Sequence, residues 1–365
     1  MKKLIIIFVG LIPIITTAQT IDTIINVGNG RKLHFTIIKG KEAPILFESG
    51  LGNGADVWKG ITKQIAEVTG ATIITYDRLS YGQEPKNFEI GFENETNALQ
   101  NALQKLGYEN KNMMLVGHSL GGMYASYFGS RNPAYVKAAV FIDDANICSL
   151  SNYFNMPSID KNEMVNKYII DILNTVIKNP MPKSIPLTDI LAADHTDENG
   201  NLDTIWSKCH KDFVAESPKR TLLSAYGVGH AIHTDNPPFV INAIVTLYAE
   251  FLIPKQKAAV LEKAYAQSLI MANESKKNEI KFGHSEDDIT SWGYSYLEKG
   301  DIEKAIEIFK INVLLYPLGW NTYDCLGEAY LKDGQIQLAL KNYKKSLELN
   351  PKNDNAVKVL DKISK

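Results

Sequence analysis

The stretch Gly117-His118-Ser119-Leu120-Gly121 follows a short apolar run and opens a run of helix formers. A serine between glycines at so tight a strand-to-helix turn has its hydroxyl pushed out of the fold, because the turn leaves no room for larger neighbours. The pattern G-x-S-x-G is common by chance, but a strand before it and a helix after it are the context that displays a nucleophile. Ser119 is therefore the expected nucleophile.

Short β-branched runs alternate with amphipathic stretches around this turn. We expect strands at 24–27, 33–38, 45–48, 72–76, 113–116, 138–142, 185–192 and 221–225, and helices at 57–68, 92–106, 123–131 and 237–251. The first two strands flank Gly28-Asn29-Gly30 and predict a hairpin. The later alternation of strands with helices is typical of βαβ units. The expected fold class is α/β, a mostly parallel sheet with helices on both faces.

The alternation stops after Asp144. Residues 146–183 read as a loop and one amphipathic helix around 161–177, so we expect a small cap over the carboxyl edge of the sheet. Ligands bind at that edge in open α/β sheets, and the cap is expected to shape the substrate pocket.

A serine hydroxyl needs a base, and the base needs a carboxylate that orients it. His230, in a glycine-rich loop after the last strand, is the expected base, and His233 is its nearest competitor. Asp143 and Asp194 each follow a strand and keep the chain order Ser, Asp, His. Asp143 is preferred because its strand is better defined. Asp144 is a third option, but as the next residue in an extended chain it points its side chain to the opposite side.

An acyl-transfer site also needs two N–H groups aimed at the developing oxyanion. The first is expected from Leu120, the residue after the nucleophile. The second is expected from Leu51, in the glycine-rich loop 49–54 that follows a buried strand.

A 34-residue repeat occupies the C-terminal part of the chain. Five residues recur in one register: Gly293, Tyr296, Ala305, Phe309 and Pro317 return as Gly327, Tyr330, Ala339, Tyr343 and Pro351. This spacing is the tetratricopeptide period, in which small residues let paired helices approach and aromatic residues fill the seam. Two repeats are fewer than the usual minimum of about three, so we expect the repeats to lean on a lead-in helix or on the preceding domain.

The N-terminus carries the pattern of a secretory signal peptide: two lysines, an apolar run at 4–15, and small residues up to Ala18. A membrane anchor is less favoured, because a span needs about 20 apolar residues and Pro13 interrupts this run. We therefore expect cleavage near Ala18 and an exported protein, periplasmic or secreted, without a membrane span.

Composition excludes some classes. A formal net charge of -2 over 365 residues gives no electrostatic case for a nucleic-acid partner. Cys148, Cys209 and Cys325 lie far apart without C-x-x-C spacing, so a metal site and a cofactor are not expected, and we expect three ordinary thiols.

These observations divide the chain into a signal peptide at 1–18, an α/β domain at 19–255 with its cap at 146–183, a helical linker at 256–285, and repeats at 286–365 that end in a capping helix at 354–363.

Four motifs in order resemble the α/β-hydrolase superfamily, over about 24–251. Residues 47–52 are similar to its oxyanion loop, with Glu48-Ser49 where many members have a histidine before glycine. Residues 76–82 resemble its Tyr-Asp-Arg-x-Gly-x-Gly turn, with Ser80 replacing the first glycine. Residues 117–122 resemble the nucleophile elbow, and residues 229–237 resemble the histidine loop. In the members with this histidine loop the acid often follows the sixth strand, so the resemblance implies Asp143 as the acid. The C-terminal part separately resembles tetratricopeptide repeats.

The resemblance implies that Ser119 attacks an acyl carbonyl, that His230 acts as base and then acid, and that water hydrolyses an acyl-serine intermediate. An ester, thioester or amide of a small molecule is the implied substrate, and a serine at the elbow argues against dehalogenase or epoxide hydrolase action. Acyl transfer and cofactor-free perhydrolysis use the same residues. The alternative from another class is a scaffold protein that binds a protein or peptide through its repeats.

Overall fold

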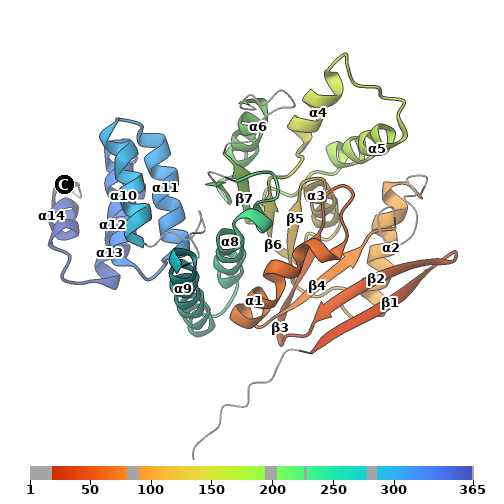
Figure 1. Ribbon diagram of the computed structural model, residues 1–365, viewed down its shortest axis with the longest axis horizontal. Coiled ribbons are helices and arrows are strands. Elements are labelled where there is room, and N and C mark those ends of the chain that lie inside the picture. Colours follow the sequence, from red (N-terminus) through yellow and green to blue (C-terminus); the bar gives the residue numbers. More distant parts are fainter. Residues whose placement is uncertain (1–18, 80–89, 194–203, 226–227, 278–285, 364–365) are drawn as a thin grey trace, which may run out of the picture.

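The computed structural model describes residues 19–79, 90–193, 204–225, 228–277 and 286–363 (Figure 1). A twisted sheet with helices on both faces forms one end of the molecule, and a stack of helices forms the other. The signal peptide expected at 1–18 lies outside the described residues. Among the described residues, no helix has the length and apolar character needed to cross a membrane.

Eight strands form one sheet in the order β1-β2-β4-β3-β5-β6-β7-β8. They are β1 (Thr20–Gly28), β2 (Arg31–Ile38), β3 (Glu42–Glu48), β4 (Ala71–Asp77), β5 (Met113–His118), β6 (Val136–Ile142), β7 (Leu187–Ala192) and β8 (Arg220–Ala225). The β1–β2 and β2–β4 pairs are antiparallel, and all other pairs are parallel. The predicted hairpin and the mostly parallel sheet are therefore confirmed.

The helices of the sheet region, defined as β1 to α8, are η1 (Ala55–Trp58), α1 (Lys59–Thr69), α2 (Phe92–Lys105), α3 (Gly121–Arg131), α4 (Ile147–Asn155), α5 (Met164–Lys178), α6 (Thr204–Ala215), α7 (Ile232–Asp235) and α8 (Pro237–Ala249). After α9 (Pro254–Lys277), the repeat region consists of α10 (Glu286–Glu298), α11 (Ile302–Leu315), α12 (Trp320–Lys332), α13 (Ile336–Leu349) and α14 (Asp354–Ile363).

The central strands are mostly apolar and buried because helices cover both faces of the sheet. In β3, Ile45 and Phe47 belong to one apolar cluster together with α1 and α8, whereas Leu46 belongs to a second cluster with α2 and α3. Every residue of β5 is buried. This double cover fixes the carboxyl ends of β5, β6 and β7 in register, where the candidate site lies.

The cap differs from the expectation of one helix. Two helices, α4 and α5, occupy it, and a third helix that was not expected, α6, precedes β8. The α4 helix has nine residues and begins where the Asn146 side chain accepts a hydrogen bond from the Ser149 N–H. In α6 only Cys209 and His210 are buried. Helices this short or this polar leave too thin an apolar stripe to be recognised from periodicity.

The expectation of three ordinary thiols was wrong. Cys148 of α4 and Cys209 of α6 form a disulfide with a Cα–Cα distance of 5.5 Å, and Cys325 is a buried free cysteine. The two partners are 61 residues apart in the sequence. The fold, rather than a local spacing motif, brings them together.

The repeat positions have the packing that the period implies. A Cβ atom on Gly293 would lie 2.4 Å from the Phe309 ring, and one on Gly327 would lie 3.1 Å from the Tyr343 ring. Both contacts are tighter than ordinary packing, so the glycines are what lets each pair of helices approach.

The repeat region packs directly on the sheet region through α11. Ile308, Ile311 and Leu314 belong to the same apolar cluster as the buried residues of α8. Two polar contacts flank this cluster: the Ser224 hydroxyl donates to Glu307 at 3.2 Å, and Lys211 pairs with Glu303 at 2.9 Å. The repeats therefore share a continuous core with the sheet region.

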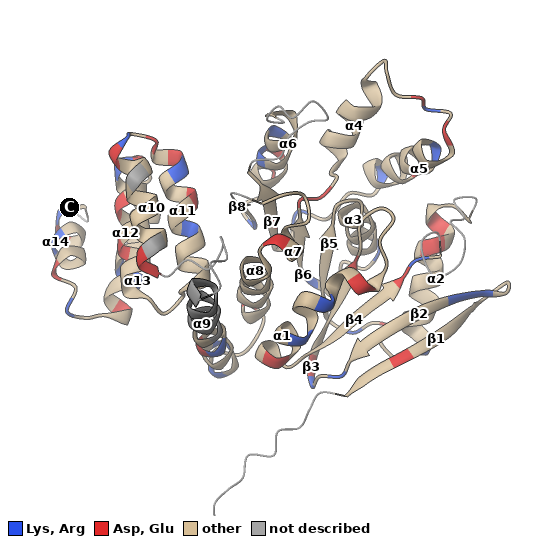
Figure 2. Ribbon diagram, viewed as in Figure 1, with Lys and Arg blue, Asp and Glu red and all other residues tan. Residues whose placement is uncertain are grey.

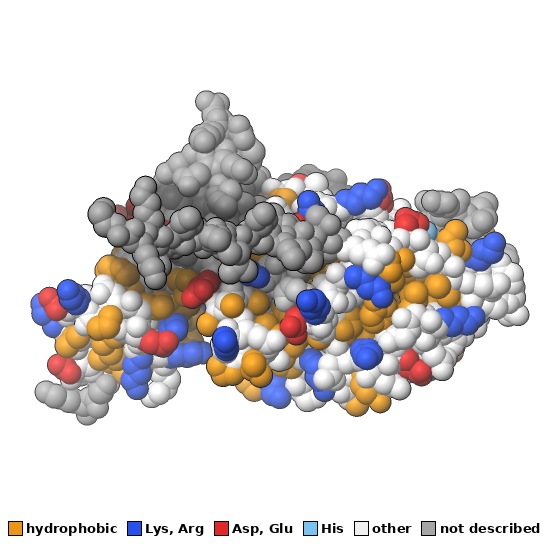
Figure 3. Space-filling model, turned by 90° about the horizontal axis from the view of Figure 1, so that it is seen from below, with side chains coloured by type: hydrophobic (Ala, Val, Ile, Leu, Met, Phe, Trp, Pro, Cys, Tyr) orange, Lys and Arg blue, Asp and Glu red, His pale blue; other side chains and the backbone are white. Residues whose placement is uncertain are grey.

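Charged residues of both signs are interspersed over the sheet region and the repeat region (Figure 2). On the face seen from below, apolar side chains lie among charged and polar ones (Figure 3). Neither view singles out an extended surface of one charge.

Candidate active site

Ser119 lies between the end of β5 and the start of α3, with a φ of 53°. Its flanking glycines are required by close backbone contacts. A Cβ on Gly117 would lie 2.8 Å from the Gly121 carbonyl oxygen, and one on Gly121 would lie 2.2 Å from the Glu48 carbonyl oxygen. A left-handed serine held by such a turn is a strained conformation that concentrates at functional sites.

Asp143 and His230 lie together at the same edge of the sheet. His230 Nδ1 is 2.6 Å from Asp143 Oδ2, and Asp143 is fully buried. The other carboxylate oxygen of Asp143 accepts hydrogen bonds from the Ala192 N–H at 2.9 Å and from the Trp206 indole at 3.0 Å. Asp143 also has a positive φ, of 44°. Its carboxylate is thus held by donors from three separate elements.

These donors decide the ionisation of Asp143. Burial is the largest influence and works to raise its pKa. The hydrogen bond and charge of His230, with the Ala192 and Trp206 hydrogen bonds, outweigh burial and hold the pKa of Asp143 below its ordinary value. The ionised carboxylate fixes the proton of His230 on Nδ1, which leaves Nε2 as the basic nitrogen.

Two further histidines surround His230. The rings of His118 and His233 are 4.6 Å apart, and His118 Nε2 lies 3.0 Å from the His230 carbonyl oxygen. Burial, followed by the charges of neighbouring histidines, lowers the pKa of His118 to about 3 and that of His233 to about 4. Both imidazoles are therefore neutral, and His118 supports the backbone of His230.

The structure separates the other candidates. His233 is buried beside Trp58, with 4.7 Å between ring centroids, whereas it is His230 that pairs with Asp143. Asp144 is buried next to His210, whose Nδ1 lies 3.7 Å away. Asp194 lies outside the described residues.

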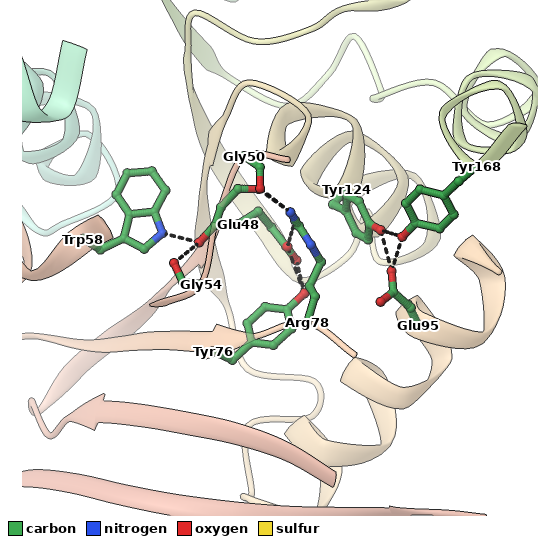
Figure 4. Close-up of polar contacts among 10 residues, drawn as sticks. Glu48, Gly50, Gly54, Trp58, Tyr76, Arg78, Glu95, Tyr124 and Tyr168 are labelled. Carbon is green, nitrogen blue, oxygen red and sulfur yellow. Dashed lines mark hydrogen bonds and ion pairs between the residues drawn. The ribbon is translucent and has the colours of Figure 1, made fainter. Parts of the chain in front are cut away.

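The oxyanion loop is anchored from behind by Arg78 (Figure 4). Arg78 Nη2 donates to the carbonyl oxygens of Ser49 at 2.6 Å and Gly50 at 2.8 Å, and Arg78 Nη1 pairs with Glu48 at 3.3 Å. Because a peptide unit is planar and trans, binding the Gly50 carbonyl to Arg78 turns the Leu51 N–H away from Arg78.

The loop also lies against the nucleophile. A Cβ on Gly50 would lie 3.2 Å from Ser119 Cβ. Leu120 caps the N-terminus of α3, where backbone N–H groups lack helical partners. In the described part of the chain, neither Leu51 nor Leu120 donates to a backbone carbonyl in the loop and turn hydrogen bonds. Both N–H groups therefore remain candidates for binding an oxyanion.

Ser49 and Arg78 carry structural tasks that the sequence did not reveal. The Ser49 hydroxyl donates to the Gly54 carbonyl at 2.9 Å and accepts from the Trp58 indole at 2.9 Å, so it closes the loop. The Arg78 guanidinium lies 4.1 Å over the Tyr124 ring. The Tyr-Asp-Arg motif was a signal for Arg78, but Trp206 had none, because it lies on the unexpected helix α6.

A buried polar network continues from Arg78 to the cap. The Tyr124 hydroxyl donates to Glu95 at 2.5 Å, and Tyr168 of α5 also donates to Glu95 (Figure 4). Burial raises the pKa of Glu48 to about 7, although the charge of Arg78 and the hydrogen bond from Tyr76 each lower it. The hydrogen-bonded group around Glu95 thus meets the group around Arg78 where the Arg78 guanidinium lies over the Tyr124 ring.

Known proteins show the same two parts. A family model for the alpha/beta hydrolase fold matches residues 43–168, and one for the tetratricopeptide repeat matches residues 320–353. The chain therefore combines an α/β-hydrolase fold with C-terminal tetratricopeptide repeats, as its motifs predicted.

Individual relatives are distant. The sn-1-specific diacylglycerol lipase ABHD11 of Mus musculus is 20% identical over 249 residues, covering 56% of this chain and 80% of the relative. The uncharacterized protein YqjL of Bacillus subtilis is 21% identical over 229 residues, covering 60% and 88%. The solved structure of mouse alpha/beta hydrolase domain-containing protein 10 matches with a TM-score of 0.50 at 17% identity, covering 62% of this chain and 99% of that one. That structural likeness concerns the fold.

Proposed function

We propose that this protein is a serine hydrolase that cleaves an ester bond of a small molecule through an acyl-enzyme intermediate. The observation that carries the proposal is the 2.6 Å contact between Asp143 and His230 at the sheet edge where the strained Ser119 turn also lies. In this reaction His230 Nε2 removes the proton of Ser119 as its oxygen attacks the carbonyl carbon. Asp143 holds the imidazole and stabilises its positive charge.

The Leu51 and Leu120 N–H groups bind the oxyanion of the tetrahedral intermediate. His230 then returns the proton to the leaving alcohol, which departs and leaves the acyl group on Ser119. Water, deprotonated by the same imidazole, attacks the acyl group and restores the serine. A thioester or amide is handled by the same steps, and an acyl acceptor or peroxide in place of water gives acyl transfer or perhydrolysis.

A fluorophosphonate probe tests the nucleophile, because it reacts with a serine only when a neighbouring base activates it. We expect the wild-type protein to be labelled at Ser119 and the Ser119→Ala variant to remain unlabelled. Ser126→Ala, on the helix α3 that follows Ser119, is the matched control and should label normally. Equal labelling of Ser119→Ala would overturn the assignment.

The name of the mouse relative suggests diacylglycerol as one ester to test. A panel of p-nitrophenyl esters of increasing acyl length, together with diacylglycerol and a short-chain thioester, would separate the substrate classes. Turnover of the short esters alone would exclude a lipase, and turnover of diacylglycerol alone would support one.

We propose that the repeats stabilise the hydrolase, because α11 shares the apolar cluster of α8. A docking role for a protein or peptide is the alternative, and the hydrolase would then be a scaffold with a minor catalytic role. Two results together would favour the alternative. A partner would be captured only when α12 to α14 are present, and the fluorophosphonate probe would label the wild type no more than Ser119→Ala. We also propose the domain limits of the chain: an α/β domain at 19–255, a helical linker at 256–285 and the repeats at 286–365.

We also propose export, with cleavage near Ala18. The Cys148–Cys209 disulfide supports it, because disulfides persist in oxidising compartments. The intact mass of the protein purified from the cell envelope tests it. A mass that includes residues 1–18 would contradict cleavage.

A further inference from the structure

Three ionisable side chains meet beside the proposed triad but take no part in it. Asp144 follows β6, Asp189 lies in β7 and His210 lies in α6. His210 Nδ1 is 2.7 Å from Asp189 Oδ2 and 3.7 Å from Asp144 Oδ1. Each of the three residues is at most 2% exposed. A single nitrogen therefore faces two carboxylates in a site closed to bulk solvent.

Hydrogen bonds satisfy this cluster only in part, through the contact between His210 Nδ1 and Asp189 Oδ2. Asp144 Oδ1 and Asp189 Oδ1 are buried and have no hydrogen-bond partner among the described residues. A buried carboxylate oxygen without a donor or a cation is costly, because it gives up hydration and receives nothing in exchange. Both oxygens are thus available as ligands.

The two buried carboxylates also favour a cation, because a divalent ion with neutral His210 as a ligand would balance their charge.

The spacing suits a small metal ion. One ligand atom from each residue lies within 4.8 Å of the others. In a tetrahedral site with metal–ligand distances of about 2.0–2.2 Å, neighbouring ligand atoms are about 3.4 Å apart. Asp144 Oδ1, at 3.7 Å from His210 Nδ1, is close to this spacing, whereas Asp189 Oδ2, hydrogen-bonded to the same nitrogen at 2.7 Å, would move away from it when an ion enters. Imidazole and carboxylate ligands together suit Zn²⁺ or Mn²⁺, whereas Ca²⁺ requires six to eight oxygen ligands.

A cavity of about 340 Å³ borders Asp144 and supplies an independent observation. It lies among α3, α4, α6 and the residues after α5, and Asn146 also lines it. The Asn146 Oδ1 atom caps α4, so its orientation is fixed, and its Nδ2 is buried without a partner among the described residues. An unused donor beside Asp144 is placed to bind a water or anion held by a cation.

We propose that Asp144, Asp189 and His210 bind one Zn²⁺ or Mn²⁺ ion, with a remaining coordination position toward this cavity. The ion ties α6 to the middle of β7 and to the residues that follow β6. Trp206, four residues before His210, donates to Asp143, so the ion also steadies the helix that supports the triad acid. The proposal does not depend on the serine chemistry, and its readouts are separate from turnover.

Metal content and affinity test the site. Full-length protein stripped with a chelator and titrated with Zn²⁺ in a calorimeter should bind one equivalent and gain thermal stability. Asp189→Asn and His210→Gln should each weaken binding about tenfold or more, because each removes a ligand. Asp212→Asn, which changes a cavity residue outside the cluster, and His233→Gln, which changes the other histidine group, should bind as the wild type does.

Absence of both Zn²⁺ and Mn²⁺ binding by the wild-type protein would overturn the proposal. Undiminished binding by Asp189→Asn would also overturn it, because the ion would then lie elsewhere. If these variants do not fold, X-ray absorption of the metal-loaded wild type still decides. One imidazole with oxygen ligands supports the site, and a shell of several imidazoles refutes it.

Discussion

Asp143 is held from three directions, by His230, Trp206 and the backbone of β7, and its role can be tested by removing only its charge. In Asp143→Asn the amide cannot fix the His230 tautomer or stabilise the imidazolium. We expect turnover to fall by about four orders of magnitude with little change in KM. Asp212→Asn, an exposed acid on α6, is the control and should keep its activity. If Asp143→Asn retains most of its turnover, Asp194 becomes the acid to examine.

His118 is predicted to make the protein sensitive to acid. Its pKa is lowered to about 3 in the folded state, below the unfolded value of about 6.5, so the unfolded chain binds the extra proton between these pH values. Stability is therefore lost as the pH falls below about 6.5. Relative to His118→Asn, the wild type should lose on the order of 2 kcal/mol of unfolding free energy between about pH 7.5 and about pH 5.

Urea denaturation at both pH values measures this difference. His34→Asn is the matched control with the opposite sign, because the hydrogen bonds that His34 donates to Asp77 and Asp22 raise the pKa of His34. A group whose pKa is raised on folding stabilises the protein at low pH and loses that contribution as the pH rises. An identical pH response of the wild type and His118→Asn would contradict the buried, neutral state of His118.

At the scale of elements, α6 connects Asp143, the proposed triad acid, with the cap. It carries Trp206, which donates to Asp143, and Cys209, which is bound to α4. Trp206→Phe keeps an aromatic ring beside His230 and removes the donor. Losing a hydrogen bond to a charged group costs about 1.5–3 kcal/mol, so we expect turnover to fall by roughly ten- to a hundredfold at unchanged KM. Steady-state kinetics on a folded variant would show unaltered turnover if the indole were only a packing group.

The disulfide should matter for stability in the same region. It closes a loop of 61 residues, for which the chain-entropy model gives about 4 kcal/mol. We expect reduction, or the paired Cys148→Ala and Cys209→Ala changes, to lower the free energy of unfolding by up to that amount. Cys325→Ala removes the free thiol and should leave the response to reductant intact. A wild-type stability that is insensitive to reductant would contradict this prediction.

Helices and strands were predictable from the sequence where a pattern of neighbouring residues specifies them. Buried parallel strands are continuous apolar runs, so β3 to β6 were expected within a few residues. Ser119, Asp143 and His230 each follow such a strand, which is why sequence alone could place them at one edge, although their catalytic roles stay predictions. Trp206, Arg78 and the cysteine pair act through contacts between distant segments, and no periodicity encodes those contacts.

At the scale of the whole molecule, the repeats are part of the hydrolase core. The α11 helix contacts β8, which precedes His230 in the chain, and α8, which follows α7 after His230. Two repeats cannot bury their faces alone, and here the hydrolase takes the place of the missing neighbour. Deleting the repeats would expose the apolar cluster around Ile308. A deletion variant could therefore lose partner binding because it is unfolded, and the experiment would not separate a docking role from a folding role.

A single truncation separates these roles. Ile308 is fully buried in the shared cluster, and Ile308→Ala should reduce the free energy of unfolding by about 2–5 kcal/mol. Because the core is continuous, the temperature at which Ser119 labelling is lost should fall together with the loss of helical circular dichroism. Leu338→Ala, at 38% exposure on α13, removes a comparable side chain from the surface and should change both by little. If Ile308→Ala melts the repeats while labelling survives to the wild-type temperature, the two parts are energetically independent, and a docking role for the repeats gains support.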